Sequence, residues 1–160
     1  MLRLRTRGLV LLAAWLTVPW MTVGALAHCQ IPCGIYDDEL RVNLMEEHTT
    51  TIQKSVKEIL RLSKEEPIDY NQLVRWVQNK EHHADEIMEI ATQYFMAQRV
   101  KPAGEEDAEG RKKYVDLLTG LHDIQIKAMK CKQTADLKAV EDLREAVHAF
   151  RHLYLGEETH

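Results

Sequence analysis

The sequence predicts an all-α protein whose fold is an antiparallel four-helix bundle. Three observations support this prediction. Apolar residues after residue 37 recur at spacings of three and four, which is the helical period. Glycine and proline interrupt this pattern in few places, so the helices are long and their connections short. The chain has 160 residues, and the 133 after residue 27 suffice for one domain with a hydrophobic core, but not for two.

The first two helices are expected at about 38–64 and 69–100, and they end near Pro67 and Pro102. The apolar face of the first helix is predicted to hold Leu40, Leu44, His48, Ile52, Val56 and Ile59. That of the second helix is predicted to hold Leu73, Trp76, His83, Ile87, Ile90 and Tyr94.

The third helix is expected at about 111–132, after a loop at 101–110, and the fourth is expected from a cap at Thr134 to Leu155. The predicted apolar face of the third consists of Tyr114, Leu117, Leu121, Ile124, Ala128 and Cys131. That of the fourth consists of Leu137, Val140, Leu143, Val147, Phe150 and Tyr154. Only 6% of residues are aromatic, so the core is expected to be mostly aliphatic.

Residues 1–27 are predicted to form a cleavable signal peptide. Three arginines open the chain, residues 9–18 are almost wholly apolar, and an Ala-Leu-Ala sequence offers the small residues that a signal peptidase accepts. We therefore expect cleavage between Ala27 and His28 and export to the periplasm or the extracellular space. The apolar run is short for a membrane span, so no stable membrane anchor is expected.

The nine residues after the predicted cut, HCQIPCGIY, contain a complete set of metal ligands. His28 would offer a free α-amino group and an imidazole, and Cys29 and Cys33 would offer two thiolates. Thiolate and nitrogen donors in a planar arrangement favour nickel or copper, whereas a tetrahedral cage rich in sulfur favours zinc. The amine, the backbone nitrogen of Cys29 and the two sulfurs can form such a plane, because Pro32 and Gly34 let the chain turn back on itself.

This string resembles the nickel hook of the nickel superoxide dismutase family. The family pattern is His, Cys, two variable residues, Pro, Cys, Gly, one variable residue and Tyr, starting at the mature N-terminus. All six fixed positions match, and the match begins at the predicted cut. The rest of the chain resembles the family by length, by helical pattern and by the pair Tyr94 and Phe95. We call residues 28–36 the hook, and residues 37–160 are expected to form the bundle, in one domain with the hook.

The resemblance implies an enzyme that disproportionates superoxide to oxygen and hydrogen peroxide by cycling between Ni(II) and Ni(III). One nickel ion per chain would be bound by His28 through its amine and, in the oxidised state, its imidazole. Cys29 would bind through its backbone nitrogen and sulfur, and Cys33 through its sulfur. Tyr36 would stand over the open face and admit only small anions. His28, Cys29, Cys33 and Tyr36 are therefore the expected catalytic residues, and the resemblance also implies a homohexamer.

Two other interpretations of the hook remain open from the residues alone. An exported nickel or copper carrier or sensor would use the same ligands without turnover, although a pure chelator does not need Tyr36. A disulfide between Cys29 and Cys33 would leave a purely structural exported bundle. That pairing explains neither His28 nor its position at the predicted cut.

The charge of the chain indicates which partners to expect. The first 27 residues hold three arginines and no acidic residue, so the rest holds 18 basic and 25 acidic residues, a formal charge of −7. This balance argues against a nucleic-acid partner. Net charge also does not attract an anionic substrate, so local positive groups near the hook are expected to do so.

Histidines outside the hook have simpler interpretations. His48 and His83 are predicted to be hydrogen-bonded residues on apolar faces. In better-known members of the family that the hook resembles, a basic residue and an acidic residue orient the axial histidine. His83 and Asn43 hold about those places here, so this chain departs from that pattern.

Cys131 is predicted to be a buried, unreactive thiol, with a disulfide to Cys29 or Cys33 as the alternative. Glu145 and His148 make a single ExxH step, half of the motif of di-iron bundles. Together with Glu141 and His152, they are expected on a solvated face instead.

Overall fold

The computed structural model describes residues 35–156, so the predicted signal peptide and most of the hook lie outside the described residues. This part of the chain is helical throughout, apart from its connections. The π-helix η1 continues α3 without a break, so the chain forms four rods, and the prediction of an all-α four-helix bundle is confirmed. In chain order the elements are α2 (Asp38–Leu62), α3 (Tyr70–Glu89), η1 (Ile90–Arg99), α4 (Ala108–Gln133) and α5 (Leu137–Leu155).

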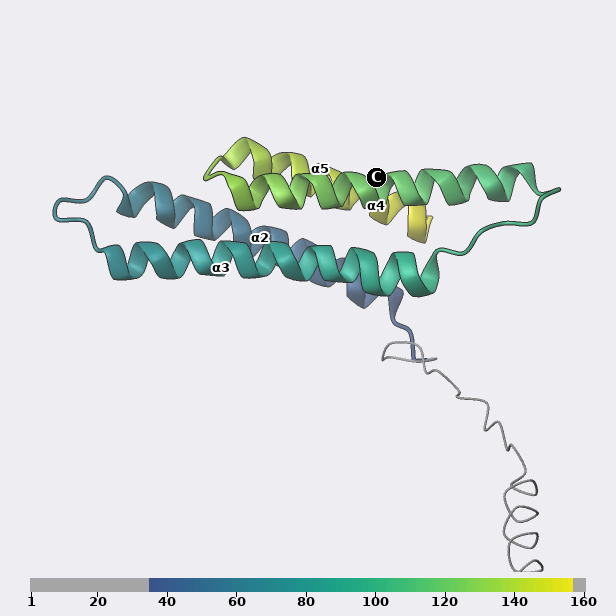
Figure 1. The fold of residues 1–160 in the computed structure, drawn as a ribbon, viewed down its shortest axis with the longest axis horizontal. Helices are drawn as coiled ribbons and strands as arrows, with labels where there is room; N and C mark the ends of the chain where they lie inside the picture. The colour runs from purple at the N-terminus through teal and green to yellow at the C-terminus, as the bar shows by residue number, and fades with distance from the viewer. Residues whose placement is uncertain (1–34, 157–160) are drawn as a thin grey trace, which may run out of the picture.

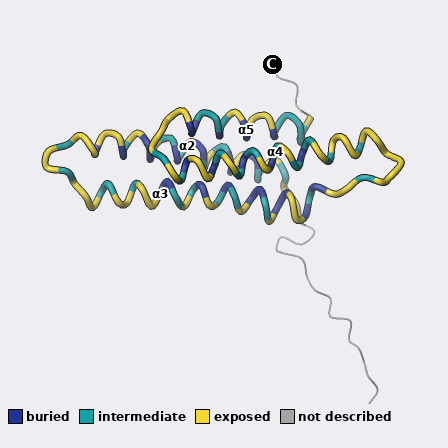
Figure 2. The backbone as a smooth tube through the Cα atoms, turned by 45° about the horizontal axis from the view of Figure 1, so that its top comes forward, coloured by how far each residue is buried: buried dark blue, intermediate teal, exposed yellow. Residues whose placement is uncertain are grey.

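The four rods pack as two antiparallel hairpins (Figure 1). α2 packs against α3 and α5, and α4 packs against α3 and α5, so each rod contacts two others. The hairpins are staggered, and the loops α2–α3 and η1–α4 lie at opposite ends of the molecule (Figure 1). The buried residues face inward along the rods (Figure 2). The start of α2, just after the hook, therefore lies near the end of η1 and the end of α5.

An aspartate begins each of the four rods. Backbone N–H groups at the start of a helix have no partner within the helix, and a carboxylate in the preceding position can accept their hydrogen bonds. Asp37 accepts from the backbone of residue 40 at 2.9 Å, and Asp69 accepts from that of residue 72 at 3.1 Å. Asp107 and Asp136 do the same for α4 and α5.

The predicted start of the fourth helix is wrong, because Asp136 and not Thr134 caps α5. Thr134 instead terminates α4, where its hydroxyl donates to the carbonyl oxygen of Lys130 at 3.1 Å. A hydroxyl and a carboxylate in neighbouring positions are both good caps, so the sequence did not distinguish them.

The predicted apolar faces are correct for α4 and partly wrong for α2 and α5. In α4 every predicted residue except the half-buried Tyr114 is buried. In α2, Leu40 is 48% exposed, while Val42 and Met45 are fully buried. Steps of four residues advance about 400° around an α-helix, so a stripe built only from such steps drifts off the core. Leu137, at the start of α5, is also exposed.

Aromatic rings fill the core at the hook end of the bundle. Phe95 of η1 is completely buried, and its ring centroid lies 4.9 Å from that of Phe150 and 5.0 Å from that of Tyr154. Tyr94 packs edge-on against Phe95 at 5.1 Å. Such edge-to-face pairs add to the stabilisation that burial provides. A continuous aromatic cluster thus joins η1 to α5 close to the start of α2.

A buried lysine joins the two hairpins near the C-terminal end of α4. Lys80 is only 3% exposed, and its ammonium group donates to the carbonyl oxygens of Cys131 and Lys132 and to the carboxylate of Glu81. The last carbonyls of a helix have no partner within it. Lys80 therefore satisfies the C-terminal end of α4 from α3.

Candidate metal centre

Tyr36 is the predicted site residue that the structure describes, and it lies against the end of η1. The guanidinium carbon of Arg99 is 4.2 Å from the centroid of the Tyr36 ring. The edge of Tyr94 meets the same ring, with centroids 6.0 Å apart and planes at 68°. Tyr36 is 38% exposed, so one part of its ring is held by the bundle and another part is open. His28, Cys29 and Cys33 lie outside the described residues.

A single carboxylate, that of Asp38, organises the surroundings of Tyr36. Arg99 binds it with two groups, Nη2 to Oδ2 at 2.7 Å and Nε to Oδ1 at 2.8 Å. The hydroxyl of Tyr94 donates to Oδ1 at 2.6 Å, and that of Tyr154 donates to Oδ2 at 2.8 Å. Asp38 therefore ties the start of α2 to η1 and to the end of α5.

These contacts set the protonation states of the group. Burial alone would raise the pKa of Asp38, but the hydrogen bonds from Arg99, Tyr94 and Tyr154 outweigh it, and the pKa lies below its ordinary value. Burial and the hydrogen bond to Asp38 raise the pKa of Tyr94 and that of Tyr154 to about 12. At neutral pH the carboxylate is therefore charged and both phenols keep their protons.

Two guanidinium groups, those of Arg99 and Arg41, place positive charge beside the rings of Tyr36 and Tyr94. Arg99 is largely neutralised by Asp38. Arg41 lies over the Tyr94 ring, 5.1 Å from its centroid, and within the described residues its buried Nε atom has no hydrogen-bond partner. Positive groups at this position favour the approach of an anion even though the protein is acidic overall.

The structure pairs His48 and His83 with each other. Their Nδ1 atoms lie 2.7 Å apart between α2 and α3, which confirms the prediction that they are hydrogen-bonded. Burial lowers the pKa of both imidazoles, and the neighbouring charge of His83 lowers that of His48 further. Asn43, which holds about the place of the acidic residue in the family pattern, accepts a hydrogen bond from Arg151 at 2.6 Å.

Comparison with known protein families decides the identity of the chain. Residues 23–158 match the family described as nickel-containing superoxide dismutase, and this range includes the hook and all the helices found in residues 35–156. The chain belongs to the nickel-containing superoxide dismutase family. No curated protein and no solved structure matches the chain.

Membership of the nickel-containing superoxide dismutase family gives the protein its activity and its metal. It is an oxidoreductase that uses nickel to dismutate superoxide, as the resemblance of the hook implied. Family membership also favours turnover over the alternative of a metal carrier or sensor.

Within residues 35–156 no group of three or more histidines, cysteines, aspartates or glutamates could hold a metal ion. His148 and Glu145 are exposed, in agreement with the predicted solvated face. Cys131 is a free thiol whose pKa is raised to about 11 by burial, and the prediction that it is buried is confirmed. A raised pKa keeps a thiol in its less reactive, protonated form.

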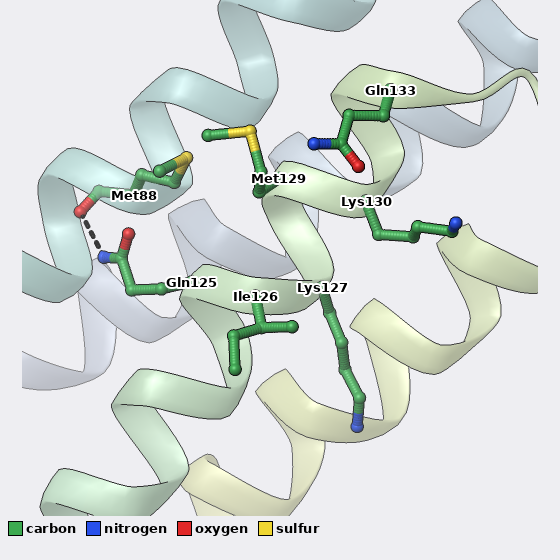
Figure 3. A pocket seen from close by; sticks show the side chains of 7 residues that line it. All are labelled: Met88, Gln125, Ile126, Lys127, Met129, Lys130 and Gln133. Carbon is green, nitrogen blue, oxygen red and sulfur yellow. Dashed lines mark hydrogen bonds between the residues drawn. The ribbon is translucent and has the colours of Figure 1, made fainter.

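A groove between α3 and α4 is unsuited to the dismutase reaction. Figure 3 shows Met88 and Met129 beside Ile126, with Gln125 donating to the Met88 carbonyl oxygen at 2.8 Å. The groove has no thiol, imidazole or carboxylate in its lining, so it offers none of these donors for a transition metal.

In the described residues, no helix is both long enough and apolar enough to cross a membrane.

Spacing along the sequence did not identify Asp38, Arg99, Arg41 and Tyr154 as residues that lie around Tyr36 and Tyr94. Asp38 was read as the first residue of a helix, and Tyr154 only as part of an apolar face. Tyr94 and Arg99 are five positions apart, a spacing that brings no two residues together on an α-helix. The only available signal was the position of Asp38 two residues after Tyr36.

Proposed function

We propose that the nickel of this dismutase is held by the hook, through the amine and imidazole of His28, the backbone nitrogen and sulfur of Cys29 and the sulfur of Cys33. Bound nickel supplies the one-electron cycling between Ni(II) and Ni(III) through which superoxide is converted to oxygen and hydrogen peroxide. The observation that carries the proposal is the placement of Tyr36, the last hook residue, on Arg99 and Tyr94 at one end of the bundle.

The donor set of the hook fits nickel. Two thiolates and nitrogen donors can supply the planar geometry that Ni(II) adopts. The thiolates of Cys29 and Cys33 also donate electron density that favours the higher oxidation state. The imidazole of His28 would add a further nitrogen donor that supports that state. Nitrogen and oxygen donors alone would not stabilise it in this way.

The short sequence separation between Tyr36 and Cys33 limits how far Tyr36 can lie from the proposed metal ligands. Cys33 and Tyr36 are three residues apart, so their Cα atoms are separated by at most about 11 Å. Any metal bound to the Cys33 sulfur therefore lies near the end of the bundle where Arg99 holds the Tyr36 ring. In this position Tyr36 restricts access to small anions and its hydroxyl orders water for proton delivery.

The positive charges of Arg41 and Arg99 attract superoxide. Their guanidinium groups lie next to the rings of Tyr94 and Tyr36, in a protein whose charge after residue 27 is otherwise negative. A local positive potential raises the rate at which an anion reaches a site. Since Asp38 offsets much of the charge of Arg99, Arg41 contributes most of this attraction.

Maturation completes the site. We propose that a signal peptidase cuts between Ala27 and His28 during export to the periplasm or the extracellular space, which frees the α-amino group that binds nickel. We also propose a homohexamer, as the hook resemblance implies, in which a neighbouring subunit covers the hook.

A one-residue extension tests the role of the amine. Chains that begin at His28 and chains with one added glycine before His28 are prepared and loaded with nickel. The extension keeps every side chain and removes only the free amine of His28. We expect the extended chain to lose the thiolate-to-nickel absorption and to lose dismutation by at least about a hundredfold, the scale on which misplaced reacting groups reduce rates.

A matched control carries the added glycine at the C-terminus and should behave like the unextended protein. Circular dichroism should show the same helicity in all three chains, because the hook precedes the bundle. Full nickel binding and activity in the extended chain would show that the amine is not a ligand.

A further inference from the structure

The contacts of Asp38 are unusual for a residue at the start of a helix. Its carboxylate accepts hydrogen bonds from Arg99, Tyr94 and Tyr154, and its side chain is only 20% exposed. Charge-assisted hydrogen bonds of this kind are stronger than neutral ones, and the two-point contact with a guanidinium fixes orientation as well as distance. Asp38 therefore holds the plane of Arg99 in one place.

The π-helix is what brings two of these donors to the same carboxylate. In an α-helix, five residues advance about 500°, so residues 94 and 99 would point about 140° apart. A π-helix closes its hydrogen bonds between residues five apart, as the bond from Val100 N to Phe95 O at 2.8 Å shows here. Tyr94 and Arg99 consequently lie one turn apart on one face of η1, and both reach Asp38.

Arg99 in turn places its guanidinium carbon over the Tyr36 ring. The separation of 4.2 Å from the ring centroid lies well within the range of a cation–π contact. Tyr94 packs its edge against the same ring, so two groups that Asp38 fixes hold Tyr36 from two directions. Ile35, the preceding residue, is 78% exposed, which leaves Arg99 and Tyr94 as the groups that hold this end of the hook.

We propose that Arg99, held by Asp38, is a positioning residue that fixes the ring of Tyr36 over the nickel site. The inference rests on the proposed function, which places Tyr36 beside the metal. Arg99 does not touch the reacting atoms, so apart from its positive charge, which a lysine would keep, its effect on dismutation passes through the orientation of Tyr36. The planar fork of arginine is required for this, since a lysine can neither bind Asp38 at two points nor stack on a ring in the same way.

The lysine variant separates positioning from attraction of the substrate. Arg99→Lys keeps the positive charge near the hook, so a residue that only attracts superoxide would tolerate the change. A positioning residue would not, because the stacked plane is lost. Arg61→Lys is the matched control, since Arg61 also pairs with two carboxylates, that of Glu58 on α2 and that of Glu65 just after α2, but far from the hook.

The first readout needs no nickel. The chain has five tyrosines, so protein labelled with 3-fluorotyrosine gives five fluorine resonances, and Tyr36→Phe identifies that of Tyr36. In the metal-free protein, Arg99→Lys should move the Tyr36 resonance toward its position in the unfolded chain, and Arg61→Lys should leave it in place. An unchanged Tyr36 resonance in Arg99→Lys would overturn the proposal. Arg99→Gln gives the same test if the lysine variant does not fold.

The second readout uses the nickel-loaded protein. Arg99→Lys should keep its nickel content and lose dismutation by roughly ten- to a hundredfold. Introduced into Tyr36→Phe, the same change should cost almost nothing further, because two residues that act as a unit are not additive. Additive losses would contradict the proposal. If the unsubstituted protein binds no nickel at the hook, the proposed function fails, while the fluorine experiment still decides whether Arg99 orients Tyr36.

Discussion

His48 and His83 share a hydrogen bond between two nitrogens that can each carry a proton. At 2.7 Å, one Nδ1 must donate and the other must accept, so the bond exists only while at least one ring is neutral at that atom. When both rings are protonated, both Nδ1 atoms carry protons, the bond is lost and the two charges repel. This pair is therefore a point of acid sensitivity between α2 and α3.

The sign of this effect follows from the lowered pKa values of both histidines. Burial depresses them below the ordinary value of 6.5, so the unfolded chain binds more protons in acid than the folded chain does. The stabilisation is present above about pH 6.5 and is lost as the pH falls through the lower folded values. We expect the free energy of unfolding in urea to fall between about pH 7 and about pH 5.

Two substitutions test whether the pair of His48 and His83 causes this loss of stability. His48→Gln cannot titrate in this range, so the fall in the free energy of unfolding should become smaller. His122→Gln, a change at an exposed histidine of α4, should leave the fall in the free energy of unfolding unaltered. The same pH dependence in all three proteins would show that other groups cause it.

At the residue scale the sequence predicted contacts only where spacing along one helix implied them. It predicted burial of Cys131 and hydrogen bonding of His48 and His83, because each falls on an apolar face. It did not predict that His48 and His83 bind each other, or that Asp38 receives Arg99, because those pairs come from different helices. The distances within these pairs depend on how the helices pack against each other. The spacing of residues along one helix does not predict that packing.

At the scale of the elements, substituting alanine for each of two glycines of α4 is expected to affect stability differently. A methyl group added at Gly120 would meet only Phe150 Cδ2, at an ordinary contact distance of 3.6 Å. Gly120→Ala should therefore raise the free energy of unfolding by about 0.5–1 kcal/mol, since alanine has the higher helix propensity.

Gly110 provides the contrast to Gly120 within the same helix. A methyl group there would lie 2.2 Å from Oδ2 of Asp107, the carboxylate that caps α4. Displacing that cap costs about 1 kcal/mol and offsets the gain in propensity, so Gly110→Ala should not stabilise the protein. Thermal or urea unfolding of both variants measures the difference, and equal stabilisation by both would contradict the role of Asp107.

The helix boundaries were predictable because prolines and caps mark them, and the observed ends differ from those expected by a few residues at most. The π-helix η1 was not. Its residues continue the apolar pattern of α3, and a period of 3.6 residues gives no sign that hydrogen bonds switch to residues five apart. This one local change creates the face that carries Tyr94 and Arg99, so the sequence predicted the bundle but not the groups beside Tyr36.

For the whole molecule, the bundle is a scaffold that holds Tyr36, the last residue of the hook, at one end. The start of α2, the end of η1 and the end of α5 meet at Asp38, directly after the hook (Figure 1). The nickel-containing superoxide dismutase family accounts for the activity, and the structure accounts for how the last hook residue is held. The central claim that joins them is that nickel binds a chain whose first residue is His28.

Intact mass and nickel content of the mature protein, purified from the cells that naturally make it, test this claim most directly. The account predicts a mass that begins at His28, two reduced cysteines in the hook and about one nickel ion per chain, the stoichiometry of a single closed ligand set. A chain that starts at another residue and still holds its nickel would contradict the account. So would a chain that starts at His28 but carries no nickel and a disulfide between Cys29 and Cys33.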